Sequence, residues 1–159
     1  MIGPITAAAL AAAITMTPGV TPAKEVKPCR DRIVQAITDA GWKGRHVRVA
    51  YGVAWRESNL NPTTISPSDD WGLFQLNRPT WEGTPYWPAD PLNARSNAKA
   101  AHKLWKVTSW RPWGLNSTGT GVDMRDYNWS DWQISNWVWQ PYVEGLRRFD
   151  RLPRECRRA

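Results

Sequence analysis

An apolar stripe that ends in a glutamate is the feature of this sequence that most constrains its fold. Counting back from Glu57 in helical steps gives Val53 and Ala54 one turn earlier, and Val49 and Ala50 two turns earlier. Residues with this spacing share one face of an α-helix, so the stripe predicts a helix whose apolar face enters the core. Because Glu57 lies on the same face, we expect its carboxyl group to be partly buried.

A partly buried Glu57 suits acid–base chemistry. A carboxyl group taken out of water with no cation beside it favours its protonated form, which a general acid needs near neutral pH. Arg56 is expected to point about 100° away around the helix and to leave this carboxyl group alone. The alternative is that Glu57 merely ends the helix and hydrogen-bonds the following loop.

The residues after Glu57 predict a loop and then a tight glycine step. Asn61-Pro62 ends the helix, because a residue before proline is disfavoured in helical geometry and proline has no N–H group. Gly72 lacks a Cβ atom, so backbone or ligand can approach it closely. Gln75 follows with donors and an acceptor that suit a ligand rich in hydroxyl and acetamide groups.

The segment from Glu57 to Gln75 resembles the signature of the goose-type lysozyme and soluble lytic transglycosylase families of the lysozyme superfamily, roughly E-S-x-F-x-P-x-A-x-S-P-x-G-A-x-G-L-M-Q. The positions in register, without a gap, are Glu57, Ser58, Pro62, Ser66, Pro67, Gly72, Leu73 and Gln75. Weaker similarities follow in the helix that contains Asn97, in the turn at 110–113 and in the pair Tyr142-Val143. The resemblance covers residues 29–115 well and 116–150 poorly.

The resemblance implies cleavage of the β-1,4 bond between N-acetylmuramic acid (MurNAc) and N-acetylglucosamine (GlcNAc) in peptidoglycan. Glu57 would protonate the glycosidic oxygen and then, as a carboxylate, take the proton of the muramyl C6 hydroxyl, which gives a 1,6-anhydro end. Ser58 would help to position this glutamate. The residues expected to bind substrate are Ser58, Trp71, Gly72, Gln75, Asn97 and Tyr142.

The chain departs from the family pattern at Asp69-Asp70, where the family usually has Gly-Ala. Either aspartate could be the second carboxylate of a hydrolytic muramidase, since hydrolysis normally uses two acidic groups. The alternative is a solvated turn, in which Asp and Ser side chains bond to the local backbone. Hydrolysis is therefore one alternative function. A non-catalytic cell-wall-binding module, which would keep the cleft without the chemistry, is another.

Twelve tryptophans are unusually many for a chain of this length. Flat indole rings lie well against the C–H faces of sugars, and their N–H groups reach hydroxyls. The alternative for each is ordinary packing in the core. Those expected on the loops around a sugar cleft are Trp71, Trp81, Trp87, Trp110 and Trp113.

The net charge of +7 and pI near 9.8 predict long-range attraction to polyanions. The resemblance implies peptidoglycan glycan strands as the partner, and because no nucleic-acid-binding module is recognisable, we expect no nucleic acid. His46 and His102 have no further ligand at metal-binding spacing, so no metal and no cofactor are expected. We expect a monomer that is secreted, acting outside the cell or in the cell wall, or associated with a phage particle or phage lysis.

Two cysteines, Cys29 and Cys156, bracket the predicted domain with a separation of 127 positions (156 − 29). A disulfide between them would constrain the unfolded chain by about 4–5 kcal/mol and would suit an oxidising compartment. Two free thiols are the alternative, because the sequence does not supply their distance.

Residues 1–23 resemble a signal peptide, with an apolar run over 5–16 and small residues at 21–23, although no lysine or arginine precedes the run. The run is too short to span a bilayer, so we expect no stable membrane insertion. Residues 24–28 are a predicted linker, and 29–156 a predicted lysozyme-like transglycosylase domain.

The expected fold is mainly α, of the α+β lysozyme-like type. It is a helical bundle around a central catalytic helix, with at most a small β-hairpin near 65–76 and a cleft between lobes. The expected helices are 30–40, 45–59, one that starts near Asp90-Pro91 with Asp90 as its cap, and 130–149 with an interruption or kink at Pro141.

Overall fold

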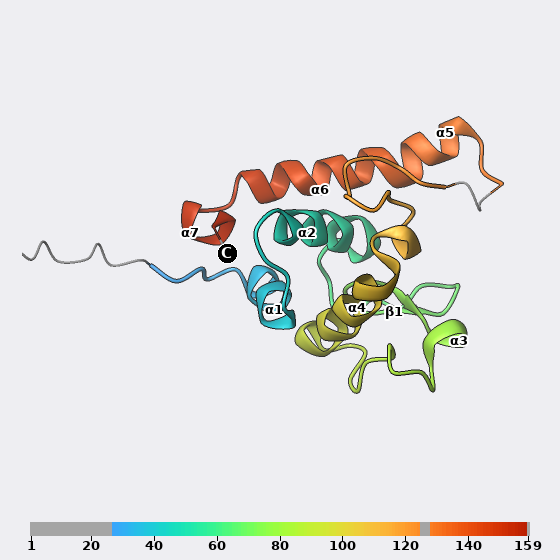
Figure 1. Ribbon diagram of the computed structural model, residues 1–159, viewed down its shortest axis with the longest axis horizontal. Coiled ribbons are helices and arrows are strands. Elements are labelled where there is room, and N and C mark those ends of the chain that lie inside the picture. The colour runs from blue at the N-terminus through green and yellow to red at the C-terminus, as the bar shows by residue number, and fades with distance from the viewer. Residues whose placement is uncertain (1–26, 125–127, 159) are drawn as a thin grey trace, which may run out of the picture.

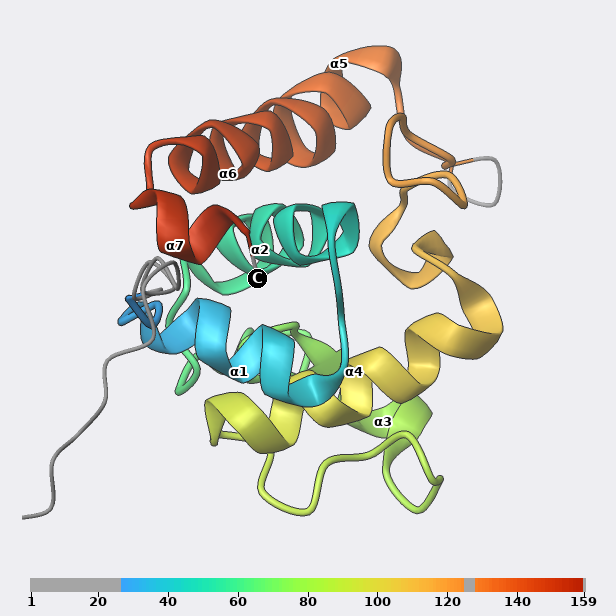
Figure 2. The ribbon, with the colours of Figure 1, turned by 60° about the vertical axis from the view of Figure 1, so that its left-hand side comes forward.

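The helix that carries Glu57, α2 (Arg45–Ser58), lies in the middle of the molecule, as Figures 1 and 2 show. On one side of α2 lies α6 (Gln140–Asp150), and on the other lie α1 (Arg32–Ala40) and α4 (Ala94–Thr108). This computed structural model describes residues 27–124 and 128–158. The expected signal peptide at 1–23 and the linker residues 24–26 lie outside the described residues.

The other elements are short. They are β1 (Asp70–Trp71), β2 (Leu76–Asn77), α3 (Arg78–Trp81), the 3-10 turn η1 (Arg111–Trp113), α5 (Asp131–Gln133), the π-helix η2 (Ile134–Trp139) and α7 (Arg154–Arg157). The strands pair antiparallel, with Asp70 opposite Asn77 and Trp71 opposite Leu76. The prediction of a mainly helical protein with one small hairpin is therefore confirmed.

The apolar stripe of α2 is buried as its spacing predicts. Val49, Ala50, Val53 and Ala54 all belong to the core. Ile37 of α1 and Leu104 of α4 belong to the same core cluster, so the central helix is covered on the side that faces these two helices. The carboxyl-terminal end of α2, which carries Glu57, is thereby held in a defined place.

A close crossing of α2 and α6 depends on two glycines. A Cβ atom added to Gly145 would lie 2.8 Å from both Cα and the carbonyl oxygen of Gly52. A Cβ atom added to Gly52 would meet Tyr142 and Leu146 of α6. Because neither glycine has a side chain, the two helix backbones can approach closely, and α6 covers the second side of the central helix (Figure 1).

The starts of two helices differ from the sequence prediction. Helix α4 begins at Ala94 with Asn93 as its cap, and the Asn93 side chain accepts hydrogen bonds from the N–H groups of Arg95 and Ser96. Asp90 is not the cap, because its carboxylate accepts from the N–H group of Leu92, within the turn that precedes the helix.

The second difference concerns Pro141. It lies in the first turn of α6, and the helix reaches it without a break through the π-helical segment η2. Proline has no N–H group, so a regular α-helical hydrogen bond cannot form at this position. The helix changes from π-helical to α-helical geometry just before Pro141, and this change takes the place of the predicted interruption or kink.

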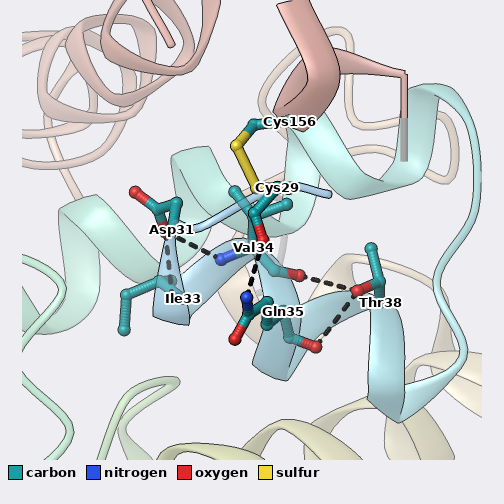
Figure 3. The surroundings of a disulfide bond; sticks show 7 residues. All are labelled: Cys29, Asp31, Ile33, Val34, Gln35, Thr38 and Cys156. Carbon is teal, nitrogen blue, oxygen red and sulfur yellow. Dashed lines mark hydrogen bonds between the residues drawn. A yellow bond between two sulfur atoms is a disulfide. The ribbon is translucent and has the colours of Figure 1, made fainter. Parts of the chain in front are cut away.

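A disulfide joins Cys29 and Cys156, with a Cα–Cα distance of 4.6 Å, so the alternative of two free thiols is wrong. Figure 3 shows its surroundings. The carbonyl oxygen of Cys29 accepts a hydrogen bond from Nε2 of Gln35 at 2.6 Å, and Asp31 caps α1 through the N–H groups of Ile33 and Val34. The bond thus ties α7 near the end of the chain to the start of α1.

None of the helices in the described ranges combines the length and the apolar character that crossing a membrane requires.

Candidate active site

A cavity of about 490 Å³ lies beside the carboxyl-terminal end of α2. Glu57 of α2, Gln75 of the β1–β2 loop and Trp113 of η1 line it, together with Trp137 of η2. Segments far apart in the sequence therefore meet at one carboxyl group, which is the arrangement that a cleft enzyme requires.

Glu57 contacts Arg56 directly. Its side chain is 22% exposed, and Nε of Arg56 lies 3.0 Å from its Oε1 atom. Nη2 of Arg56 also donates to this oxygen, and to the carbonyl oxygen of Trp113 at 2.8 Å. The expectation that Arg56 leaves the carboxyl group alone is therefore wrong. The long guanidinium side chain folds back over its neighbour because Trp113, from a distant segment, supplies a second acceptor.

This contact acts on one carboxylate oxygen only. Among the described residues, Oε2 of Glu57 accepts no hydrogen bond, so it is the oxygen left for a proton or a substrate. Nη1 of Arg56 is also buried, and it has no hydrogen-bond partner among the residues that the structure describes. The pair thus combines a buried cation with one committed and one uncommitted carboxylate oxygen.

Gln75 shares the cavity with Glu57 and is held rigidly. Its backbone is in the left-handed region, with φ of 48°, and its Nε2 atom donates to the carbonyl oxygens of Thr64 at 3.1 Å and Gly72 at 2.9 Å. Both contacts use the amide nitrogen. The amide oxygen accepts no hydrogen bond from residues that the structure describes, so it is the group that Gln75 offers to a ligand.

Gly72 and Asn97 hold the glycine loop in place rather than line the cavity. Gly72 has a φ of 79°, and a Cβ atom there would overlap the carbonyl oxygen of Pro91 and Nδ2 of Asn97. The fully buried Asn97 donates to the carbonyl oxygens of Trp71 and Pro91, both at 3.0 Å, and accepts from the N–H group of Phe74 at 2.8 Å. Its hydrogen-bonding capacity is thus largely used within the protein.

Ser58 links the end of α2 to the same loop. It is buried, and its Oγ atom lies 3.0 Å from the carbonyl oxygen of Ala54 and 2.9 Å from that of Leu73. This contact fixes the distance between the helix that carries Glu57 and the loop that carries Gln75. Ser58 therefore contributes through position rather than through the cavity surface.

Tyr142 and Trp71 lie outside the cavity lining. The buried hydroxyl of Tyr142 donates to the carbonyl oxygen of Gly119 at 2.6 Å, and burial raises the pKa of Tyr142 to about 12. Nε1 of Trp71 donates to Asp69 at 2.6 Å, and the Trp71 ring packs against that of Trp87. Both polar groups are thus engaged within the protein.

The two adjacent aspartates occupy different environments. Asp70 lines the cavity and accepts from Oγ of Ser66 at 2.9 Å, Oγ of Ser68 at 2.5 Å and Nδ2 of Asn77 at 2.9 Å. Asp69 lies outside the lining, and the hydrogen bonds from Trp71 and then Arg78 lower the pKa of Asp69. Only Asp70 shares a cavity with Glu57.

The tryptophans expected around the cleft separate into three groups. Trp81 and Trp113 line the cavity, Trp110 is fully buried in the core, and Trp71 and Trp87 pack together outside the lining. Sequence reasoning missed Trp129 and Trp137, which also line the cavity. The density of tryptophans between 129 and 139 was the available signal.

The described residues contain no group of three or more His, Cys, Asp or Glu side chains that could hold a metal ion. The polar and aromatic groups of the cavity lining include the carboxyl groups of Glu57 and Asp70, the guanidinium of Arg56, the amide of Gln75 and several indole rings. A mainly helical fold that brings a glutamate, a glutamine and tryptophans into one cavity is the arrangement that the resemblance to lysozyme-like glycosidases implies.

Comparison with known families agrees with this class. Residues 36–109 match the family model of the transglycosylase SLT domain, a range that contains Glu57, Gln75 and Asn97. The match supports the lysozyme-like SLT superfamily, whose activity at the family level is that of a peptidoglycan lytic transglycosylase. A search of the curated proteins and a search of the solved structures found no match.

Proposed function

We propose that this protein cleaves the β-1,4 MurNAc–GlcNAc bond of peptidoglycan as a lytic transglycosylase, with Glu57 as general acid and then general base. The observation that carries the proposal is the shared cavity of Glu57 and Gln75, close to the end of the central helix. The family match supplies the substrate class.

The proposed reaction uses one carboxyl group twice. A proton on Oε2 of Glu57 passes to the glycosidic oxygen, the bond from that oxygen to C1 of the muramyl ring breaks, and GlcNAc leaves with a free hydroxyl group. The resulting carboxylate takes the proton of the muramyl C6 hydroxyl, whose oxygen bonds to C1 and closes the 1,6-anhydro ring. Arg56 contacts Oε1 only, so it stabilises the carboxylate between the two steps and leaves Oε2 available for the proton.

The other cavity residues bind and position the sugar. The amide oxygen of Gln75 accepts a hydrogen bond from a hydroxyl or acetamide N–H group, and Trp81 packs against a sugar face. Trp113 is 5% exposed and its Nε1 atom donates to the carbonyl oxygen of Phe74, so it supports the cavity wall. Ser58, Gly72 and Asn97 act by holding the loop against α2. Trp71 and Tyr142 act through packing, since their polar groups are bonded within the protein.

The disulfide is compatible with a secreted protein, because such bonds persist in oxidising compartments. We propose that the protein acts outside the cell or in the cell wall, as a monomer on glycan strands.

Hydrolysis is the second candidate reaction. Asp70 rather than Asp69 would be its second carboxylate, because Asp70 lines the cavity that contains Glu57. In that reaction Asp70 would activate water or attack the sugar, and the product would carry a reducing end. The hydrogen bonds that Asp70 accepts from Ser66, Ser68 and Asn77 equally suit a structural turn.

The deciding experiment combines Glu57→Gln with mass analysis of the released fragments. Wild type should release muropeptides from purified sacculi with ends one water lighter than reducing ends, whereas Glu57→Gln should bind sacculi and release none. Glu82→Gln, at the exposed end of α3, is the matched control and should behave as wild type. Reducing ends would establish hydrolysis instead, and binding without release by wild type would identify a non-catalytic module.

A further inference from the structure

Three exposed tryptophans lie together next to the cavity. Trp129, Trp132 and Trp137 are 39%, 64% and 54% exposed, respectively. The ring of Trp137 packs edge-on against both others, with centroid distances of 5.8 Å to Trp129 and 6.0 Å to Trp132. We call these three residues the tryptophan rim. Clustered, exposed aromatic rings of this kind mark an interaction surface.

Two residues of the rim lie on either side of the start of the π-helix η2, since Trp132 belongs to α5 and Trp137 to η2. Trp132 and Trp137 are five positions apart, which would point them about 140° apart around a regular α-helix. In a π-helix the hydrogen bonds join residues five apart, so such residues lie on one face. The N–H group of Gln140 indeed bonds to the carbonyl oxygen of Ser135, five positions earlier. The wider turn of η2, which follows α5 directly, reduces this separation, and the two ring centroids lie 6.0 Å apart.

The rim is continuous with the active-site cavity. Trp129 and Trp137 line the cavity that contains Glu57 and Gln75, and Trp132 extends the aromatic surface beyond it. All three residues lie outside the segment that matches the SLT family model. The rim is therefore a feature of this chain that the family match does not supply.

The charge of the segment that carries the rim favours one kind of ligand. The sequence from 128 to 146 contains no lysine or arginine, and its acidic residues are Asp131 and Glu144. Binding to nucleic acid or to an anionic membrane depends on basic side chains beside the aromatic ones. A neutral sugar ring needs none, since its C–H face packs on indole and its hydroxyls reach the polar neighbours.

From these observations we infer that the tryptophan rim binds N-acetylhexosamine rings of the glycan strand beyond the bond being cut. The inference rests on the proposed function for its substrate class. A strand that passes Glu57 continues onto the rim, which increases affinity for long strands more than for short fragments.

The test measures binding of peptide-free glycan strands to Glu57→Gln protein, so that the strands stay intact. Adding Trp132→Ala should raise the Kd about three- to tenfold, the loss expected for one aromatic contact. Trp132→Phe should recover most of the affinity. Val107→Ala, which truncates an equally exposed apolar residue on α4, is the control and should leave the Kd unchanged. Because Trp132 is largely exposed, all three variants should unfold at the parent temperature.

An unchanged Kd in Trp132→Ala would overturn the inference. So would binding to phosphatidylcholine–phosphatidylglycerol vesicles that Trp132→Ala abolishes, since the surface would then serve a membrane. Failure of the proposed function appears separately, as wild-type protein that releases no muropeptides while the Trp132→Ala effect on strand binding persists.

Discussion

The guanidinium group of Arg56 lies against the carboxylate of Glu57, the next residue in the same helix, with Nε 3.0 Å from Oε1. Arg56→Met should remove this contact and leave the carbonyl oxygen of Trp113 without its donor. We expect the free energy of unfolding to fall by about 1–3 kcal/mol, because Arg56 is 9% exposed and its partners are largely desolvated. We expect kcat on sacculi to fall roughly 10- to 100-fold, since Glu57 loses the group that orients it.

Arg48→Met is the matched control for Arg56→Met. Arg48 is in the same helix but pairs with Asp150, away from the cavity, and its side chain is 40% exposed. An exposed pair contributes only about 0.2–1 kcal/mol, so this variant should lose little stability and no activity. Wild-type kcat in Arg56→Met would show that Glu57 needs no such support.

Gly72→Ala should destabilise the loop that carries Gln75. The substitution strains a backbone with φ of 79° and drives a methyl group into Asn97 and the carbonyl oxygen of Pro91. We expect a loss of about 2–4 kcal/mol in urea unfolding, together with loss of activity. Gly83→Ala separates the two causes, because Gly83 has a φ of 80° but no atom within 4 Å of the added Cβ. It should cost about 1 kcal/mol and leave activity intact.

The stability of the protein should fall as the pH is lowered through the range in which histidine titrates. Burial, and then the charge of Lys106, lowers the pKa of His102 below its ordinary value of 6.5. Above about pH 6.5 the imidazole is neutral in both folded and unfolded chains, so its contribution is fully present. As the pH falls from there towards the folded-state pKa, the unfolded chain binds the proton first and stability is lost.

His102→Phe tests this contribution while keeping a ring against Trp42 and Trp105. Urea unfolding at about pH 7.5 and pH 5.5 should show a smaller loss of stability in the variant than in wild type. His46, whose pKa is lowered by burial and by Arg45, keeps its own share of the loss. If the variant and the wild type lost the same stability between these two pH values, His102 would not contribute to the pH dependence.

Sequence patterns predicted those parts of the molecule that depend on local spacing. The stripe that ends at Glu57 predicted the buried face of α2, and the glycine step predicted the loop that presents Gln75. The cap of α4 was assigned to Asp90 instead of Asn93, because both residue types cap helices and the sequence does not show which turn precedes the helix.

Features that depend on distant segments were not predictable in this way. Arg56 turns towards Glu57 because Trp113 supplies a second acceptor from 57 positions away. The rings of Trp132 and Trp137 are in contact across the junction of α5 and the π-helical segment η2, whereas α-helical counting separates them. The contacts of the Asn97 amide with Trp71, Phe74 and Pro91 likewise form only when the folded loop brings these residues together.

Asp70→Asn and Asp69→Asn form a matched pair that separates the two proposed reactions. In the lytic reaction the C6 hydroxyl is the nucleophile, so Asp70→Asn should keep anhydro ends as the product and retain kcat within about threefold, the effect of a weakened turn. In hydrolysis the loss of a second carboxylate should reduce kcat by about 100-fold or more. Asp69 lies outside the cavity and pairs with Arg78, so Asp69→Asn controls for the loss of one negative charge in the same loop. Because Asp70 is the aspartate of the two that shares the cavity with Glu57, a large kcat loss in Asp70→Asn alone would contradict the lytic assignment.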